Sequence, residues 1–358
     1  MQPLRLYVVS ISHYCDKIRW ALDFKSLPYE KIEFNPRKPP PDLKRAPKTM
    51  KKLVPILEDP NNNDLFICDS THILIYLEEQ YPQTKNLFPL NNNRQRIIDF
   101  CLKLDSTFGL YTRRLAYLQL IGEQSSKLAM VFGGKKFAWA SNPHDIRSYL
   151  FGYVFSCFVI SRYRIHRVKE DGIYEKTKQL LDDIIHDLGQ KQYLFNNEFT
   201  AADLTFCSLL KPLTVVTSIV QNPKYHSLFA YDSRIRQTYD ANGKLTTDPV
   251  VEKLLQPLPS NRKRGTTSWL LKPIYLIQFL FISLMTILVG YFYGMDSDEP
   301  PQFKVDESNP SMTVVNDQRL IKLTSKLQII PFFIRYLSHL FITIPLQLQH
   351  INSENKIK

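Results

Sequence analysis

The first 84 residues alternate between short strand-like runs and amphipathic helical runs, in an order that few folds accommodate. The strand-like runs are rich in β-branched and aromatic residues and bounded by turn residues. They are residues 4–10, 29–35, 54–59 and 65–69. Residues 15–26 and 70–82 have apolar side chains at helical spacing, and Pro82 closes the second run. The resulting order, β-α-β followed by β-β-α, predicts a small mixed sheet covered by helices.

A serine, a histidine and a cysteine stand where the first strand gives way to the first helix, in the segment S-H-Y-C at residues 12–15. A helix N-terminus offers unpaired N–H groups and a partial positive charge, which favour a thiolate. Ser12 could donate a hydrogen bond to a bound thiolate but cannot exchange disulfides. Cys15, in the first turn, could do thiol chemistry itself. A polar turn with an ordinary N-cap is the structural alternative.

The S-H-Y-C segment resembles the redox site of glutaredoxins with Ser12 in the nucleophile's place. The wider pattern resembles the N-terminal, thioredoxin-like domain of soluble glutathione S-transferases. Counted back from Arg19, Ser12 falls where zeta-like members have their serine and omega-like members their cysteine. The tyrosine of the alpha, mu and pi classes has no counterpart, because Tyr7 lies one place off, on the other face of its strand.

Two further pairs match the family pattern. Val54-Pro55 resembles the cis pair that opens the third strand, and Asp69-Ser70 resembles the acidic-serine pair at a helix start. The resemblance implies glutathione as co-substrate and no metal cofactor. It places the cysteinyl backbone of glutathione against Val54 and Pro55, the γ-glutamyl carboxylate on Ser70 and the ammonium at Asp69. Ser12, or alternatively Cys15, is the implied catalytic residue.

From residue 93 to 258 the pattern becomes helical, which predicts an all-α second domain. Its helical runs are residues 94–121, 174–190 and 201–213, with a shorter apolar run at 149–160 that suits a buried core helix. Thr200 and Asp203 form a capping box that resembles a folding motif of the glutathione S-transferase C-terminal domain. The electrophile would bind between Ser12 and this domain, near residues 105–118. Tyr111, Arg114 and Tyr117 share a helical face there, although core packing also suits them.

Residues 273–294 carry no charge over a length that spans a bilayer, so they predict a transmembrane helix; a buried core helix is the alternative. The linker at residues 259–272 contains Arg262, Lys263 and Arg264. The positive-inside rule therefore keeps residues 1–258 in the cytosol. In the tail, residues 295–358, a second apolar run at 329–348 contains an arginine and two prolines. It either spans the membrane or lies on it.

The net charge of +12 and the pI near 9.3 suit either a nucleic acid or an anionic membrane surface. No zinc-knuckle spacing, RNP-type motif or arginine-rich arm accompanies the charge, so we expect no nucleic-acid partner. No His/Cys cluster has metal-ligand spacing. The five cysteines are odd in number and widely spaced, and no signal peptide precedes them, which predicts reduced thiols.

These features predict a thioredoxin-like domain at 1–84, an all-helical domain at 93–258 and a membrane anchor. The resemblance implies a membrane-anchored glutathione S-transferase that detoxifies hydrophobic electrophiles or acts as a thiol-dependent reductase. Its membrane would be the endoplasmic reticulum or the mitochondrial outer membrane, and a homodimer is expected. The alternative is a non-catalytic adaptor like the metaxins or the ganglioside-induced differentiation-associated proteins, which also carry C-terminal membrane segments. The basic loop at 37–52 departs from compact transferases.

Overall fold

The computed structural model describes most of the first 239 residues and two short segments of the tail. The described ranges are 1–34, 40–46, 54–89, 93–120, 172–195, 198–239, 302–305 and 313–316, with single residues between 145 and 165 and Ile277. Three predicted segments lie outside these ranges: the linker 259–272, the span 273–294 and the apolar run 329–348. Ile277 is the one described residue of the span. Among the helices within them, none is both long and apolar enough to cross a membrane.

The N-terminal domain is built on a four-stranded sheet in the order β2-β1-β3-β4. Its strands are β1 (Leu4–Val8), β2 (Tyr29–Glu33), β3 (Ile56–Asp59) and β4 (Leu65–Cys68). Strand β1 runs parallel to β2 and antiparallel to β3, and β3 is antiparallel to β4. With helices α1 (His13–Phe24) and α2 (Ser70–Gln80), this is a thioredoxin-like α/β domain, and the predicted β-α-β and β-β-α order is confirmed.

Strand β1 supplies two separate cores because alternate side chains point to opposite faces of the sheet. Leu4, Leu6 and Val8 belong to the large core shared with the helices. Tyr7 belongs to a smaller cluster on the other face, together with Leu43 of the short helix η1 (Pro41–Lys44). The Tyr7 hydroxyl donates to Glu58 at 2.6 Å, so Tyr7 has a packing role, as its strand position predicts.

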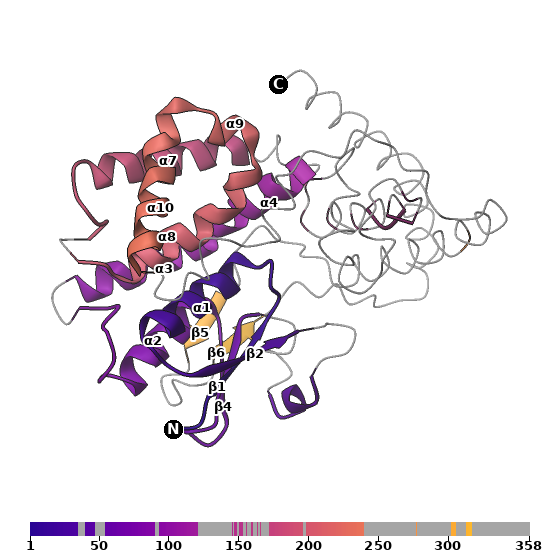
Figure 1. The fold of residues 1–358 in the computed structure, drawn as a ribbon, viewed down its shortest axis with the longest axis vertical. Coiled ribbons are helices and arrows are strands. Elements are labelled where there is room, and N and C mark those ends of the chain that lie inside the picture. Colours follow the sequence, from indigo (N-terminus) through magenta and orange to yellow (C-terminus); the bar gives the residue numbers. More distant parts are fainter. Residues whose placement is uncertain are drawn as a thin grey trace.

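The helical region packs against one side of the N-terminal domain (Figure 1). Its longer helices are α3 (Arg94–Ser106), α4 (Phe108–Leu120), α7 (Ile173–Leu188), α8 (Ala201–Leu210) and α10 (His226–Tyr239). The short elements η6 (Lys211–Val215), α9 (Thr217–Val220) and η7 (Pro223–Tyr225) join α8 to α10. This arrangement of a thioredoxin-like domain and a helical region fits the glutathione transferase fold.

The single helix predicted over residues 94–121 is in fact two helices. The chain leaves helical geometry at Thr107, where φ is −121° and ψ is −75°. The Thr107 hydroxyl donates to the Lys103 carbonyl at 2.6 Å, and the Ser106 hydroxyl donates to the same oxygen at 3.1 Å. Hydroxyl groups that bond back in this way compete with the helical pattern, which explains a break that apolar periodicity does not reveal.

The tail contains a strand pair that the sequence analysis did not identify. Strands β5 (Gln302–Val305) and β6 (Thr313–Asn316) pair antiparallel, with Phe303 opposite Val315. They form a separate two-stranded sheet, drawn in yellow in Figure 1. Each strand has only four residues, which is too short for a distinct periodic signal.

The predicted capping box at the start of α8 is present and holds together three segments of the helical domain. Asp203 is fully buried and accepts hydrogen bonds from the Thr200 N–H at 2.8 Å and the Leu194 N–H at 2.7 Å. The Tyr231 hydroxyl of α10 donates to the same carboxylate. Burial raises the pKa of Asp203, and these donors oppose the shift.

We expect Asp203→Ala to destabilise the protein by about 3 kcal/mol, because it leaves several buried donors unpaired. The measurement is the free energy of unfolding in urea. Asp183→Ala, at an exposed position of α7, is the matched control and should change it by less than about 0.5 kcal/mol. Equal effects of the two substitutions would contradict this account of the capping box.

Candidate functional site

Ser12 is the N-cap residue of α1, and its hydroxyl is not used for capping. Its backbone is extended, and its N–H donates to the Val9 carbonyl at 2.8 Å, which turns the chain into the helix. The side chain makes no capping hydrogen bond and is half-buried. It lies within hydrogen-bonding reach of Cys15. A hydroxyl donor therefore stands at the positive end of α1, as the sequence predicts.

Cys15 faces the core, where it is 1% exposed. Burial raises the pKa of its thiol to about 11, although the Ser12 hydroxyl opposes the shift. A thiolate is the reactive form of cysteine, so this placement disfavours Cys15 and favours Ser12 as the group that meets an external thiol. Cys68, Cys101 and Cys207 are also buried and free, whereas Cys157 lies outside the described residues.

The peptide bond between Val54 and Pro55 is cis, as the resemblance implies. Pro55 is buried and Val54 is half-buried at the start of β3. Within the part of the chain that the structure describes, the Val54 backbone makes no hydrogen bond. Family resemblance implies that these N–H and carbonyl groups pair with an extended peptide backbone.

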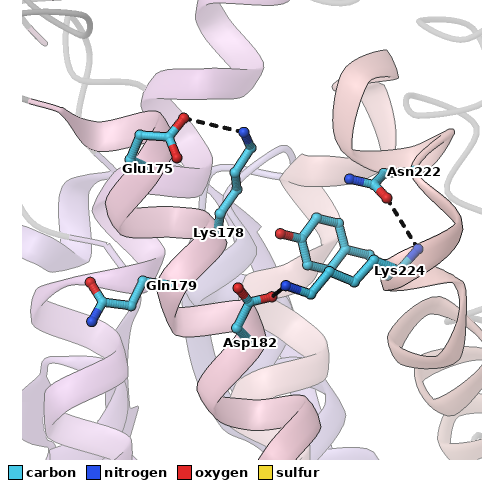
Figure 2. Close-up of a pocket in the computed structure, with 7 residues that line it drawn as sticks. Glu175, Lys178, Gln179, Asp182, Asn222 and Lys224 are labelled. Carbon is cyan, nitrogen blue, oxygen red and sulfur yellow. Dashed lines mark hydrogen bonds and ion pairs between the residues drawn. The ribbon is translucent and has the colours of Figure 1, made fainter.

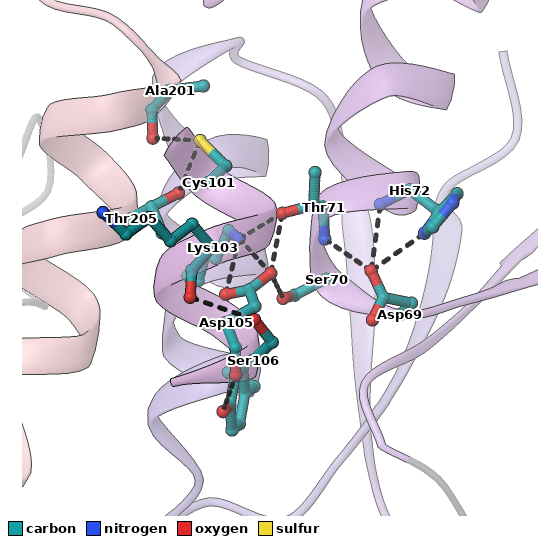
Figure 3. Close-up of polar contacts among 12 residues, drawn as sticks. Asp69, Ser70, Thr71, His72, Cys101, Lys103, Asp105, Ser106, Ala201 and Thr205 are labelled. Carbon is teal, nitrogen blue, oxygen red and sulfur yellow. Dashed lines mark hydrogen bonds and ion pairs between the residues drawn. The ribbon is translucent and has the colours of Figure 1, made fainter. Parts of the chain in front are cut away.

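Asp69 caps α2 from an unusual backbone conformation, with φ of +73°. Its Oδ1 accepts hydrogen bonds from the Thr71 N–H at 3.0 Å and the His72 N–H at 3.2 Å, and it lies 3.0 Å from His72 Nδ1 (Figure 3). A positive φ at a non-glycine residue is strained, and residues with such a backbone are concentrated at functional sites. Asp69 Oδ2 makes none of these contacts, so it could meet a ligand ammonium.

Ser70 is 2% exposed, and its hydroxyl donates to Asp105 Oδ2 at 3.0 Å (Figure 3). A hydroxyl has one proton to donate, so in this conformation it does not donate to a ligand carboxylate as well. The Ser70 N–H is the first of α2 and is not used by the Asp69 cap. This backbone donor is the group at Ser70 that could hold the γ-glutamyl carboxylate.

Asp105 belongs to a buried charged cluster that the sequence analysis missed. Lys17 of α1 is fully buried, and its Nζ lies 2.8 Å from Asp105 Oδ2 and 2.8 Å from Thr71 Oγ1. The Thr71 hydroxyl in turn donates to Asp105 at 2.7 Å (Figure 3). Burial raises the pKa of Asp105, and the Lys17 ammonium opposes the shift. The cluster joins α1, α2 and α3 directly beneath the Asp69-Ser70 pair.

The two residues after Ser12 face the helical domain. His13 is buried, and its Nε2 lies 3.0 Å from the Gly109 carbonyl of α4. Burial, followed by the charge of Arg113, lowers the pKa of His13 to about 3, so the imidazole is neutral at physiological pH. The Tyr14 hydroxyl donates to the Asp105 carbonyl at 2.7 Å. Both side chains therefore make hydrogen-bonding contacts with the backbone of the helical region.

One residue of α4 that was predicted to line the electrophile pocket has a different position in the structure. Arg114 is 8% exposed and therefore points into the interior, whereas Tyr117 stacks on Tyr163 with ring centroids 5.2 Å apart. Arg113 lies over the same Tyr163 ring, with Cζ 4.5 Å from its centroid. Arg113 rather than Arg114 therefore lies beside the aromatic pair, and Tyr111 is half-buried.

An open depression of about 480 Å³ lies on the surface of α7 and η7, away from Ser12 (Figure 2). Its charged side chains already pair with one another. Lys224 lies 2.8 Å from Asp182, and Lys178 lies 3.2 Å from Glu175. None of the predicted site residues lines it, so it is not the candidate site. Among the described residues, no group of three His, Cys, Asp or Glu side chains could hold a metal ion.

Residues 6–85 match the family model of the glutathione S-transferase N-terminal domain. This match supports placing the N-terminal domain in the glutathione S-transferase family. It covers the strand and helix junctions that present Ser12, Val54 and Asp69. No curated protein matches the chain.

Solved structures with similar folds include three glutathione transferases. The enzyme of Methylobacterium radiotolerans, in complex with glutathione sulfonate, is 14% identical with a TM-score of 0.41 and covers 73% of this chain and 99% of its own. The rice enzyme, in complex with glutathione, is 14% identical with a TM-score of 0.42. The match covers 80% of this chain and 99% of the rice enzyme. The Bombyx mori enzyme is 19% identical with a TM-score of 0.45. The match covers 71% of this chain and 97% of the Bombyx mori enzyme. At these scores the likenesses carry no conclusion about activity.

We expect Lys17→Met to destabilise the protein by about 3–5 kcal/mol, because it leaves the Asp105 carboxylate unpaired in the interior. Lys17→Met combined with Asp105→Leu should cost less than the sum of the two single changes. The free energy of unfolding in urea, measured over this double-mutant cycle, gives the coupling.

The exposed pair of Glu175 and Lys178 is the matched control, because surface ion pairs contribute only about 0–1 kcal/mol. The coupling free energy of the buried pair should exceed that of the exposed pair. If the two are equally small, the buried pair does not hold the domains together.

Proposed function

We propose that this chain is a membrane-anchored glutathione S-transferase in which Ser12 stabilises the glutathione thiolate. The observation that carries the proposal is the Ser12 hydroxyl, which is half-buried at the N-terminus of α1 and unused for capping. It lies in a segment that matches the glutathione S-transferase N-terminal domain. The described geometry of Val54, Asp69 and Ser70 supports a glutathione site beside it.

The free energies involved are sufficient for thiol activation. Lowering the pKa of a thiol by about two units requires roughly 2.7 kcal/mol. One hydrogen bond to a charged acceptor contributes about 1.5–3 kcal/mol, and a helix dipole about 0.3–1 kcal/mol. The Ser12 hydroxyl and α1 together supply this amount. The thiolate sulfur then attacks the electrophile, and the thiol proton passes to solvent.

Glutathione would lie at the end of the sheet where β3 begins and α2 starts. Its cysteinyl backbone would pair with the Val54 N–H and carbonyl groups, which make no hydrogen bond within the described residues. Its γ-glutamyl carboxylate would accept from the Ser70 N–H, and its ammonium would meet Asp69 Oδ2. The Ser70 hydroxyl would keep its bond to Asp105 and so hold the start of α2 in place.

The direct test is a pH titration of glutathione bound to the full chain in detergent, followed by the ultraviolet absorbance of the thiolate. We expect the pKa of the bound thiol to lie about two units below its free value of about 8.5. Ser12→Ala should abolish this shift, because it removes the hydroxyl donor. Cys15→Ala should preserve it, because the Cys15 thiol is buried.

A non-catalytic membrane adaptor of the metaxin or ganglioside-induced differentiation-associated type is the second candidate. The specific observation in its favour is that the Ser70 hydroxyl is committed to Asp105 rather than open to a ligand. Failure of the full chain to bind glutathione at millimolar concentration would reject the transferase and favour the adaptor. A shift that survives Ser12→Ala but disappears in Cys15→Ala would favour thiol-dependent reductase chemistry instead.

We further propose that residues 273–294 anchor the protein, with residues 1–258 in the cytosol, at the endoplasmic reticulum or the mitochondrial outer membrane. The support is the uncharged length of this run and the basic residues before it. The full chain should float with phosphatidylcholine vesicles at high salt, and a chain ending at residue 258 should not. Release of the full chain by salt would indicate electrostatic attachment, which salt screens.

A further inference from the structure

Three residues on one face of α4 line the side of the helical domain that meets the candidate site. Gly109, Arg113 and Tyr117 are spaced four residues apart, so their side chains follow one another along the helix. The Gly109 carbonyl contacts His13, and a Cβ on Gly109 would lie 2.8 Å from Tyr14 Cζ. This face therefore approaches the N-terminus of α1 closely, and Arg113 lies one turn further along it.

Arg113 has no ion-pair partner among the described residues. Its Nε is buried and makes no hydrogen bond. Its guanidinium lies over the Tyr163 ring, with Cζ 4.5 Å from the ring centroid. A buried donor without a partner is rare, and a half-buried guanidinium without a counter-ion is costly unless something else pairs with it.

The acidic groups described at the candidate site make their contacts to residues other than Arg113. Asp105 is held by Lys17, Ser70 and Thr71, and Asp69 Oδ1 caps α2. His13 is neutral and contributes no negative charge. Burial has the largest effect on both neighbouring groups, since it lowers the pKa of His13 and raises that of Tyr14. The charge of Arg113 acts on both groups, which agrees with its position near them.

The surroundings of Arg113 indicate the chemistry of its partner. A guanidinium has a planar fork of donors that suits a carboxylate, and the Tyr163 ring lies over the guanidinium of Arg113 without pairing with its charge. Tyr117 stacks on Tyr163, and the ring centroids of Tyr117 and Phe155 lie 6.4 Å apart. An aromatic wall thus adjoins the cation, and together they suit an apolar molecule with an acidic end.

We propose that Arg113 binds the carboxylate of the second substrate, so that the site selects hydrophobic electrophiles that carry a carboxylate. This inference rests on the proposed transferase function and deepens it by naming the substrate class. The electrophilic carbon would face the thiolate at Ser12, and the carboxylate would pair with Arg113, next to the rings of Tyr117 and Tyr163.

The test compares 4-fluoro-3-nitrobenzoate with its methyl ester as electrophiles for the full chain in detergent with glutathione. In either reaction the thiolate sulfur forms a bond to the carbon that bears fluorine, fluoride leaves with the bonding electron pair, and the thiol proton passes to solvent. Arg113→Met should lower kcat/KM for the carboxylate by about 10–100-fold and for the ester by less than about twofold. Arg113→Lys should partly restore the preference, and Arg96→Met, at an exposed position of α3, is the matched control.

Equal loss of activity toward the acid and the ester in Arg113→Met would overturn the inference, as would no loss toward either. A rise in the pKa of the bound glutathione thiol in Arg113→Met would also overturn it, because the anion at Arg113 would then be the thiolate.

If the wild-type chain converts neither electrophile, the proposed transferase function fails. The carboxylate site is then tested alone, by calorimetric binding of 3-nitrobenzoate. Binding that disappears in Arg113→Met but persists in Arg96→Met would support the site. No binding, or equal binding in all three proteins, would overturn it.

Discussion

The burial of the Lys17 ammonium between two domains is the constraint on which the arrangement of the candidate site depends. A fully buried cation is stable only with a well-placed counter-charge, and Asp105 of α3 supplies it at 2.8 Å. The same carboxylate accepts from Ser70 and Thr71 at the start of α2. One aspartate of the helical domain therefore fixes both helices that carry the candidate glutathione contacts.

The residue before Lys17 makes a second charged contact between α1 and the helical domain. Asp16 is 2% exposed and lies 3.4 Å from Lys211 and 3.6 Å from Arg236. Burial by itself raises the pKa of Asp16, yet Lys211, Arg236 and Arg19 together hold it well below its usual range. Trp20 packs beneath Arg236, with Cζ 5.0 Å from the ring. Helix α1 is thus held to α3 through Lys17 and to η6 and α10 through Asp16, so the position of Ser12 depends on both domains.

The sequence revealed the features that depend on local pattern and missed those that depend on distant partners. The strands of the N-terminal sheet, α7 and the Thr200–Asp203 capping box follow from periodicity and short-range spacing, and so they could be predicted. Lys17 had no such signal, because a lysine in an amphipathic helix is normally exposed and its partner lies 88 residues away. Arg113 could not be separated from Arg114, since adjacent helical positions differ only in the face that tertiary packing selects.

The chemistry open to the candidate site follows from the contrast between Ser12 and Cys15. Burial raises the pKa of the Cys15 thiol to about 11, so the thiol is protonated at neutral pH. Ser12 cannot form a disulfide, and its hydroxyl is the polar group that reaches the N-terminus of α1. A site of this kind can activate a thiol that a ligand brings, but it does not supply a reactive thiol of its own. Conjugation by bound glutathione is therefore the chemistry that the geometry supports best, ahead of disulfide exchange.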